Sequence, residues 1–173
     1  SEVPAMQAST VERLTNIGKG PTLKHPRPSS KLTGWGMLLE ICTSESSNLG
    51  TVGEEYSNVK VLRITANDDF ANPETVKLIK EAIRQNPGIS LHGSLPCTDW
   101  TTWQNPNISR HGEKYFRRLQ ARRAKSLEMV ASFIECAELA LSLGGEVSYE
   151  WHRHCTGWTQ RILVDFILSL IHI

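Results

Sequence analysis

The chain has 173 residues, of which 39% are hydrophobic and 21% are charged, and its formal net charge is +1 at pH 7. These values fit one globular domain with a substantial core, and the overall charge gives no argument for nucleic-acid binding. The longest apolar run, residues 162–173, is too short to span a bilayer. The four cysteines have no short repeated spacing, which favours reduced thiols in an intracellular compartment.

Residues 1–33 are predicted to form a flexible N-terminal arm, because prolines and basic residues gather there; residues 10–17 could make one short helix. Residues 34–173 are predicted to form the folded domain. Its first strand is expected at 35–42, where a continuous apolar run indicates burial on both faces. The polar turn 43–50 should then lead into a short helix.

The second strand is expected at 59–65. The sequence Asn-Pro-Glu at 72–74 predicts a helix start, with an N-cap, a proline in the first turn and an acid near the positive end of the dipole. The sequence Asn-Pro-Gly at 86–88 should end that helix. A third strand at 89–92 leads into a proline-cysteine loop.

A polar, aromatic loop is expected at 98–112, followed by a long helix from 113 to about 143. A fourth strand at 146–151 and a last apolar helix complete the pattern. Strands alternating with helices predict an α/β, Rossmann-like three-layer fold with a mostly parallel sheet. Because the last helix stops without a cap, we expect either that the natural domain continues or that the chain is a fragment.

Cys97 and Glu150 follow the third and fourth predicted strands. The carboxyl ends of parallel strands meet at one edge of a sheet, where ligands bind in open α/β folds. A thiol and a carboxyl that meet there could attack a heteroaromatic ring, with the thiolate adding to carbon and the acid protonating a ring nitrogen. On local sequence alone, Cys97 also fits a buried structural cysteine.

Pro96-Cys97, followed one long helix later by a strand that ends at Glu150, resembles the Pro-Cys and Glu-Asn-Val motifs of DNA cytosine-5 methyltransferases, which belong to the class I S-adenosylmethionine-dependent enzymes. Longer strings such as SLPCTDWTTWQ and GGEVSYEWHRHCTGW resemble methyltransferase-like domains of DIRS-type (tyrosine-recombinase) retroelements. This resemblance covers residues 34 to about 160.

The resemblance implies a nucleophilic Cys97, a proton-donating Glu150, an Arg153 that orients the base or a phosphate, and a target base flipped out of the duplex. It implies S-adenosylmethionine as cofactor, DNA as partner, and an intracellular location that is nuclear if the source is eukaryotic. The residues expected to line the cofactor are Glu40, Cys42, Ser44, Leu49, Asp68, Asp69 and Pro96.

Nucleic-acid contacts are expected from two aromatic residues and one basic helix face beside the proline-cysteine loop. Trp100 or Trp103 could stack on the flipped base or replace it in the duplex. The basic residues are Arg117, Arg118, Arg122 and Arg123.

The chain departs from the family pattern in several ways: one strand-helix unit is missing between Gly50 and Val59, no target-recognition region follows, and two motifs differ. The first loop has Thr-Ser-Glu-Ser-Ser at 43–47 where glycines are expected, and Trp151 follows Glu150 in place of asparagine. The alternatives are therefore a catalytically decayed relative, a noncatalytic nucleic-acid or protein-binding module of a mobile element, and a DNA amino-methyltransferase. A further alternative is a zinc ion held by His152, His154 and Cys155 together with Cys97 or Cys42. The His-x-His-Cys spacing is not that of a common zinc site, so we predict no metal.

Overall fold

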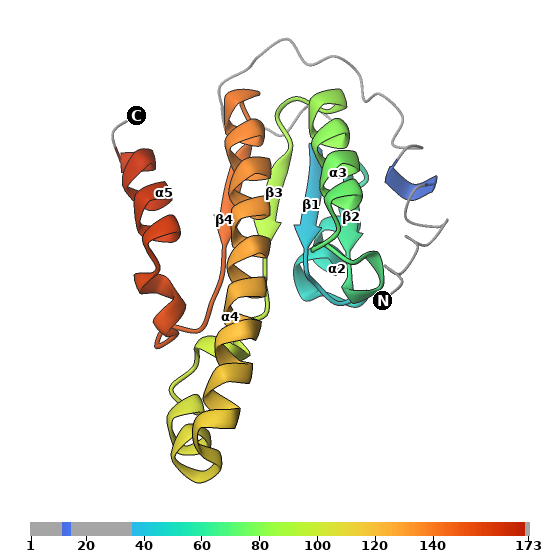
Figure 1. Cartoon of the computed structure of the whole chain (residues 1–173). Coiled ribbons are helices and arrows are strands. Elements are labelled where there is room, and N and C mark those ends of the chain that lie inside the picture. The colour runs from blue at the N-terminus through green and yellow to red at the C-terminus, as the bar shows by residue number, and fades with distance from the viewer. Residues whose placement is uncertain (1–11, 15–35, 172–173) are drawn as a thin grey trace.

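The computed structural model describes residues 12–14 and 36–171 of the chain. Its centre is a four-stranded, fully parallel sheet with the strand order β2-β1-β3-β4 (Figure 1). Because β3 pairs with β1 on the side away from β2, the strand order reverses between β1 and β3. Open α/β sheets bind ligands at the carboxyl ends of strands beside such a reversal. The strands are β1 (Gly36–Ile41), β2 (Val59–Ile64), β3 (Ser90–Gly93) and β4 (Glu146–Tyr149).

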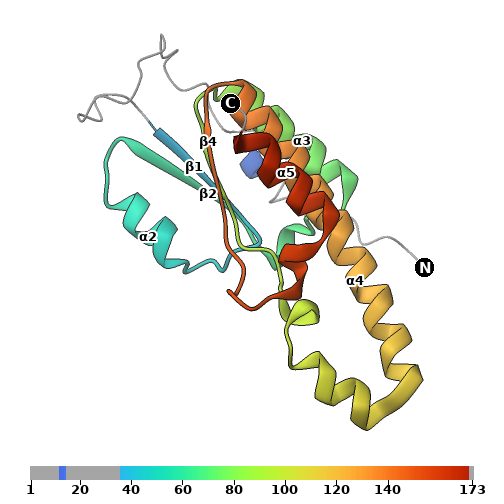
Figure 2. The same cartoon turned by 90° about the vertical axis from the view of Figure 1, so that its left-hand side faces the viewer.

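Helices lie on both faces of the sheet and give three layers (Figure 2). On one face, α2 (Asn48–Glu54) packs against β1 and β2. The predicted Rossmann-like α/β fold with a parallel sheet is therefore confirmed. No helix in the described ranges is long and apolar enough to cross a membrane. The helices on the other face are α3 (Pro73–Gln85), α4 (Gln104–Ser142) and α5 (Arg161–Ile171).

The start of α3 is the one that the sequence predicts. The side chain of Asn72 accepts a hydrogen bond from the Glu74 backbone N–H at 3.0 Å, and Pro73 is the first helical residue. Such a cap typically contributes about 1 kcal/mol. The chain leaves α3 through Gly88, whose φ of +84° is accessible to glycine without strain.

The core lies between the sheet and the α3–α4 layer. Ile41 of β1 is completely buried there. On β3, Gly93 faces α4 so closely that a Cβ at this position would overlap the ring of Phe133. Because successive strand residues face opposite sides, His92 and Ser94 point to the other face of the sheet.

That other face is only half covered. Gly50 of α2 packs against Glu40 of β1, but no helix in the described part of the chain covers β3 and β4 on this side (Figure 2). His92 and Ser148 are register partners there. Parallel sheets usually bury apolar residues on both faces, so this polar area is unusual. We call it the open face, and by strand alternation it comprises Ser90, His92, Ser94, Glu146, Ser148 and Glu150.

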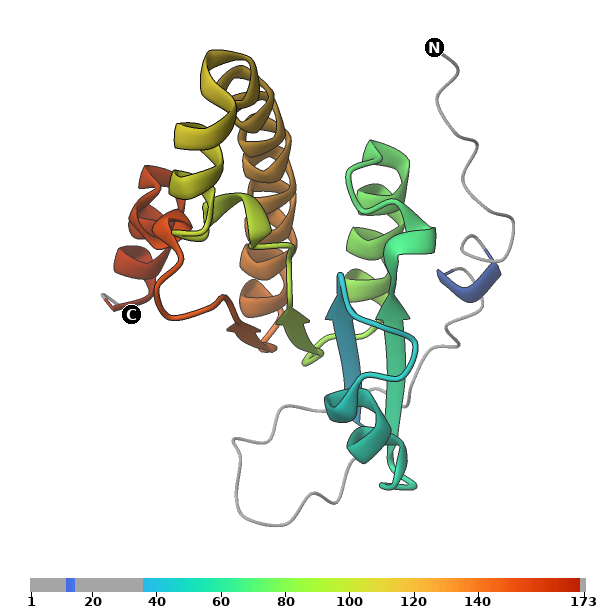
Figure 3. The same ribbon diagram turned by 90° about the horizontal axis from the view of Figure 1, so that it is seen from below.

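The loop predicted for residues 98–112 was wrong, because most of it is helical. A 3-10 turn at Thr98–Trp100 precedes α4, which breaks at Gly112 (φ 65°) and folds back on itself (Figures 1 and 3). The buried Gln104 side chain donates to the Thr98 carbonyl at 2.8 Å and accepts from the Tyr115 hydroxyl at 2.6 Å. Local periodicity does not reveal such tertiary contacts. We call residues 104–126 the α4 hairpin.

Most of the predicted N-terminal arm, residues 1–33, lies outside the described residues. The described part, residues 12–14, is a helical turn rather than free chain. Its Leu14 is 2% exposed and packs in the core, and Arg13 pairs with the carboxylate of Asp68.

Candidate active site

A pocket of about 440 Å³ lies at the carboxyl ends of β3 and β4. The segment after β3 contributes Ser94 to Cys97, and the segment after β4 contributes Glu150, Trp151 and His152. The structure therefore brings Cys97 and Glu150 to one cavity, although they are 53 positions apart in the chain (150 − 97). A volume of this size is in the range of small-ligand sites. We call it the β3–β4 pocket.

Backbone hydrogen bonds set the positions of the two segments that line this pocket. Ser94 N–H donates to the Ile41 carbonyl at 3.0 Å, and Glu150 N–H donates to the Gly93 carbonyl at 2.9 Å. The Trp151 indole N–H then donates to the Leu95 carbonyl at 2.7 Å and joins the two segments directly. The parallel ladder thus continues one residue beyond each strand and holds the pocket walls together.

Cys97 differs from the other cysteines in its surroundings. It is free, half-buried and lines the β3–β4 pocket. Burial raises the pKa of Cys42 and of Cys136 to about 12, and burial is also the main cause that raises the pKa of Cys155. The thiolate is the nucleophilic form of cysteine. The other three thiols are therefore poor nucleophiles near neutral pH.

Glu150 is exposed and belongs to a chain of hydrogen bonds on the open face. Its Oε1 accepts from the Ser94 hydroxyl at 2.9 Å. The same hydroxyl oxygen lies 3.1 Å from His92 Nε2, and His92 Nδ1 lies 2.7 Å from the Ser148 hydroxyl oxygen. The sequence motifs do not indicate His92, Ser94 or Ser148 as members of such a chain. The period-2 alternation after a parallel strand was the signal that could have grouped them.

The segment after the pocket places the neighbouring predicted residues differently. Arg153 is exposed and is not among the pocket-lining residues, whereas His152 is. Among the described residues, no group of three His, Cys, Asp or Glu side chains could hold a metal ion. The zinc alternative at His152, His154 and Cys155 therefore gains no support.

An aromatic cluster includes one residue that lines the pocket, Trp151. The ring centroids of Tyr149 and Trp151 are 5.3 Å apart, and those of Trp151 and Trp158 are 5.8 Å apart. Trp100 is 4% exposed, and its indole N–H donates to the Ser126 hydroxyl at 2.9 Å. Trp103 is 78% exposed at the start of the α4 hairpin. Of the two predicted stacking residues, only Trp103 presents its ring to solvent.

Two of the three acids in the predicted cofactor set, Glu40 and Asp68, are buried and paired with other groups of the protein. Glu40 is 1% exposed, and its carboxylate accepts from the Ser47 hydroxyl at 2.6 and 2.8 Å and lies 3.5 Å from Arg63 Nε. Asp68 is 3% exposed, caps the turn after β2 by accepting from Thr65 N–H at 2.6 Å, and pairs with Arg13. In this arrangement both carboxylates have hydrogen-bond partners within the protein.

The remaining predicted cofactor residues lie on the same edge of the sheet. Cys42 follows β1 with a positive φ of 60°, and Asp69 follows the turn after β2 with a φ of 43°. Ser44 and Leu49 are exposed. Pro96 lines the β3–β4 pocket instead. The predicted cofactor set thus spans β1, the start of α2 and the segments after β1, β2 and β3. Of its three acids, Glu40 and Asp68 are buried and Asp69 is partly exposed.

The predicted basic face lies on the α4 hairpin, which projects beyond the carboxyl edge of the sheet (Figure 1). Arg122 Nε lies 2.8 Å from Asp99 Oδ1, and Arg123 sits over the Trp100 ring, 5.1 Å from its centroid. Arg117 pairs with a glutamate one turn earlier. Among the described residues, Arg118 makes no ion pair, so it is the predicted cation most available to a phosphate.

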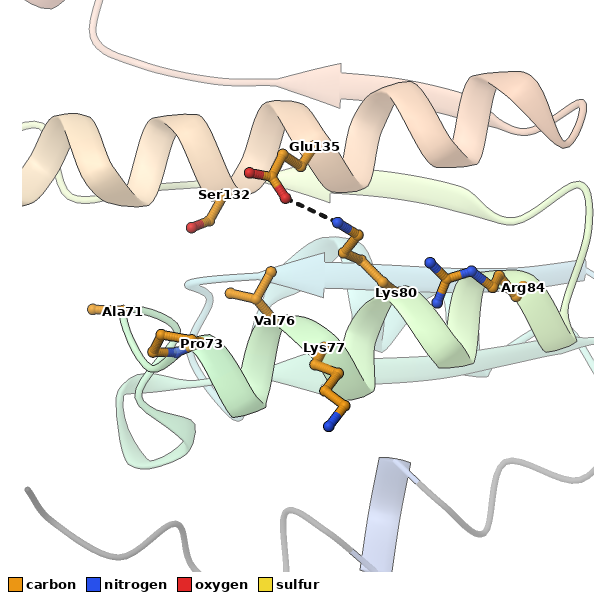
Figure 4. Close-up of a pocket in the computed structure, with 8 residues that line it drawn as sticks. All are labelled: Ala71, Pro73, Val76, Lys77, Lys80, Arg84, Ser132 and Glu135. Carbon is orange, nitrogen blue, oxygen red and sulfur yellow. Dashed lines mark hydrogen bonds and ion pairs between the residues drawn. The ribbon is translucent and has the colours of Figure 1, made fainter.

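A second pocket, of about 430 Å³, lies between α3 and α4 (Figure 4). Lys80 Nζ is 2.9 Å from Glu135 Oε2 across it, and Figure 4 shows these two side chains pointing toward one another. The other two cations in its lining, Lys77 and Arg84, pair with carboxylates on α3 itself. The Lys80–Glu135 ion pair connects α3 with α4. Because each cation in the lining already has a carboxylate partner, we assign no ligand to this pocket.

The chain has no counterpart in the comparisons with known proteins. No protein-family description, no curated protein and no solved structure matches it. The geometry of the described residues is therefore the basis for a functional proposal.

Proposed function

We propose that the β3–β4 pocket receives a pyrimidine base turned out of DNA, and that the domain is a methyltransferase-like domain directed at carbon 5 of cytosine. The observation that carries this proposal is the presence of Cys97 and Glu150 in one pocket. Nucleophile and acid then stand on adjacent strand ends, as covalent attack on a flat ring requires.

In the proposed reaction, the Cys97 thiolate adds to carbon 6 of cytosine and Glu150 donates a proton to nitrogen 3. The proton prevents negative charge from accumulating on the ring, and the addition makes carbon 5 nucleophilic. The base must leave the duplex first, because neighbouring bases cover both ring faces in the stack. S-adenosylmethionine as methyl donor is proposed on the resemblance alone.

DNA is the proposed partner, which implies a nuclear location if the source is eukaryotic. The α4 hairpin lies at the same edge of the sheet as the pocket (Figure 1). Its Arg118 makes no ion pair with any residue that the structure describes. Exposed arginines contribute affinity through phosphate contacts and counterion release. Trp103, at the base of the hairpin, offers the ring that could stack on an unpaired base.

A mechanism-based trap tests the covalent step without any cofactor. A DNA duplex carrying 2-pyrimidinone in place of cytosine should form a denaturant-stable adduct, seen as a gel shift and a mass increase of one DNA strand. Cys97→Ser should abolish the adduct, and Glu150→Gln should slow its formation by about 100-fold, the lower range for a general acid. Cys136→Ala, which removes a buried thiol on α4, is the matched control and should leave it unchanged. Failure of the unaltered protein to form an adduct would refute the proposal.

A noncatalytic nucleic-acid-binding module is the second candidate, and one observation favours it. The carboxylates of Glu40 and Asp68 are buried and accept hydrogen bonds from the protein itself. A ligand that binds the folded state raises the melting temperature by mass action. S-adenosylhomocysteine at millimolar concentration should therefore stabilise a methyltransferase. DNA binding without this stabilisation and without an adduct would favour the noncatalytic module.

A further inference from the structure

A row of polar side chains crosses all four strands on the face that bears α2. In the register, His92 of β3 lies between Glu40 of β1 and Ser148 of β4, and Glu40 lies beside Arg63 of β2. α2 covers the Glu40 end of this row, because its Gly50 packs against Glu40. In the described part of the chain, no helix covers β3 and β4 on this side (Figure 2). His92 is half-buried and Ser148 is exposed, so water can reach the His92 end of the row.

His92 is joined to Glu150 through one hydroxyl group. Ser94 Oγ lies 3.1 Å from His92 Nε2 and donates to Glu150 Oε1 at 2.9 Å. On its other side, His92 Nδ1 lies 2.7 Å from Ser148 Oγ. An ionised carboxylate can only accept, so the Ser94 proton must point at Glu150. The Ser94 oxygen is then left to accept from Nε2–H.

The same geometry suits a charged imidazolium, in which both ring nitrogens donate. Nε2–H then donates to Ser94, and Nδ1–H donates to Ser148. If the Nε2 proton moves to Ser94 while the Ser94 proton moves to Glu150, the ring becomes neutral and the carboxylate becomes a carboxylic acid. Ser94 keeps one proton throughout, and Ser148 still accepts from Nδ1–H. Every group remains hydrogen-bonded before and after the transfer.

We propose that Glu150 draws the proton that it donates from His92, through the hydroxyl of Ser94. This inference rests on the proposed role of Glu150 as a proton donor to a bound base. A base in the β3–β4 pocket would displace water from Glu150 on the pocket side, whereas His92 regains its proton from water at the open face. Histidine is the side chain that exchanges protons near neutral pH.

Several charged groups surround His92, the proposed source of the proton. α2 is the one described helix on this side of the sheet. Its Glu54 forms an ion pair with Arg63, with 2.6 Å between Oε1 and Nη1. The charged groups that face His92 from the neighbouring strands and the segment after β4 are Glu40 with its partner Arg63, Glu146 and Glu150. Carboxylates therefore outnumber cations among these groups.

Replacing Ser94 by threonine and by alanine isolates the hydroxyl, because both variants keep the charges at His92 and Glu150 in place. The first measurement is NMR with ¹⁵N-labelled histidine and ¹³C-labelled glutamate. In the unaltered protein and in Ser94→Thr, the chemical shift of the Glu150 carboxyl carbon should change at the pH at which His92 titrates. This change in chemical shift should be smaller in Ser94→Ala. Equal changes in the two variants would overturn the proposal.

The second measurement is the rate of adduct formation with the 2-pyrimidinone duplex as a function of pH. The rate should fall above the His92 midpoint found by NMR, both in the unaltered protein and in Ser94→Thr. Ser94→Ala should slow adduct formation by at least about 10-fold. In this variant, the rate should no longer fall as the pH rises through the His92 midpoint. Ser90→Ala, on the same face of β3, should behave as the unaltered protein. Identical pH profiles for the Ala and Thr variants would refute the link through Ser94.

These two measurements separate the inference from the proposed function. If the unaltered protein forms no adduct, the proposed function fails, and the NMR comparison still decides whether Ser94 couples His92 to Glu150. If the adduct forms with the same pH profile in all Ser94 variants, the proposed function stands and the proton path does not.

Discussion

Glu40→Gln separates a structural role for this acid from the cofactor-binding role that the sequence suggested. The substitution keeps the shape of the side chain and removes its charge. In the structure, the Glu40 carboxylate receives two contacts from the Ser47 hydroxyl, which itself caps α2 by accepting from Gly50 N–H at 3.0 Å. It also lies 3.5 Å from Arg63 Nε, whose side chain is 15% exposed. One acid therefore supports both the α2 cap and a nearly buried arginine.

We expect Glu40→Gln to lower the free energy of unfolding by about 3 kcal/mol. Removing one partner of a buried ion pair costs roughly 3–5 kcal/mol. The lower end applies here because Arg63 keeps its second partner, Glu54, at 2.6 Å. For a domain of this size, a loss of about 3 kcal/mol corresponds to a fall of about 6–12 °C in melting temperature.

Urea denaturation followed by circular dichroism measures this change, and Glu54→Gln is the matched control. Glu54 is exposed and contacts the same arginine, so its replacement should leave the unfolding curve nearly unchanged. Equal midpoints for the two variants would refute the structural assignment of Glu40. A normal midpoint combined with lost S-adenosylhomocysteine binding would support its predicted cofactor role.

Three further outcomes are expected. At about pH 8, iodoacetamide should label Cys97 first in mass spectra, because burial raises the pKa of Cys42 to about 12 and leaves roughly one thiolate in ten thousand there. Gly93→Ala should cost about 1–3 kcal/mol in urea denaturation, since a methyl group overlaps a ring of α4. Arg118→Gln should reduce the slope of log binding constant against log salt for duplex DNA by about 1, whereas Arg161→Gln on α5 should not change it.

Each of these outcomes can fail in a defined way. Faster labelling of a buried thiol than of Cys97 would mean that the β3–β4 pocket does not favour a reactive cysteine. An unchanged midpoint for Gly93→Ala would mean that α4 moves away from β3 at little cost. An equal salt slope for the two arginine variants would remove the α4 hairpin from the proposed DNA interface.

The site was predictable where it depends on strand ends. Cys97 and Glu150 could be paired from sequence because parallel strands carry their carboxyl ends to one edge, and the pocket contains both. Their chemical roles stay predictions. Trp100 could not be separated from Trp103 by composition, because the burial of Trp100 depends on its packing under Arg123 and its hydrogen bond to Ser126.

The sequence by itself determined the α/β alternation, the start of α3 at Asn72 and the polar ends of the strands, because these follow from local periodicity, capping and turn chemistry. The tertiary structure alone decided which polar groups are buried and paired with other groups of the protein. Glu40 and Asp68 are buried against partners that local patterns do not indicate. His92 meets Ser148 across 56 positions because β3 and β4 pair in one register. Burial and hydrogen bonding of such groups depend on which strands become neighbours, and that is a property of the whole sheet.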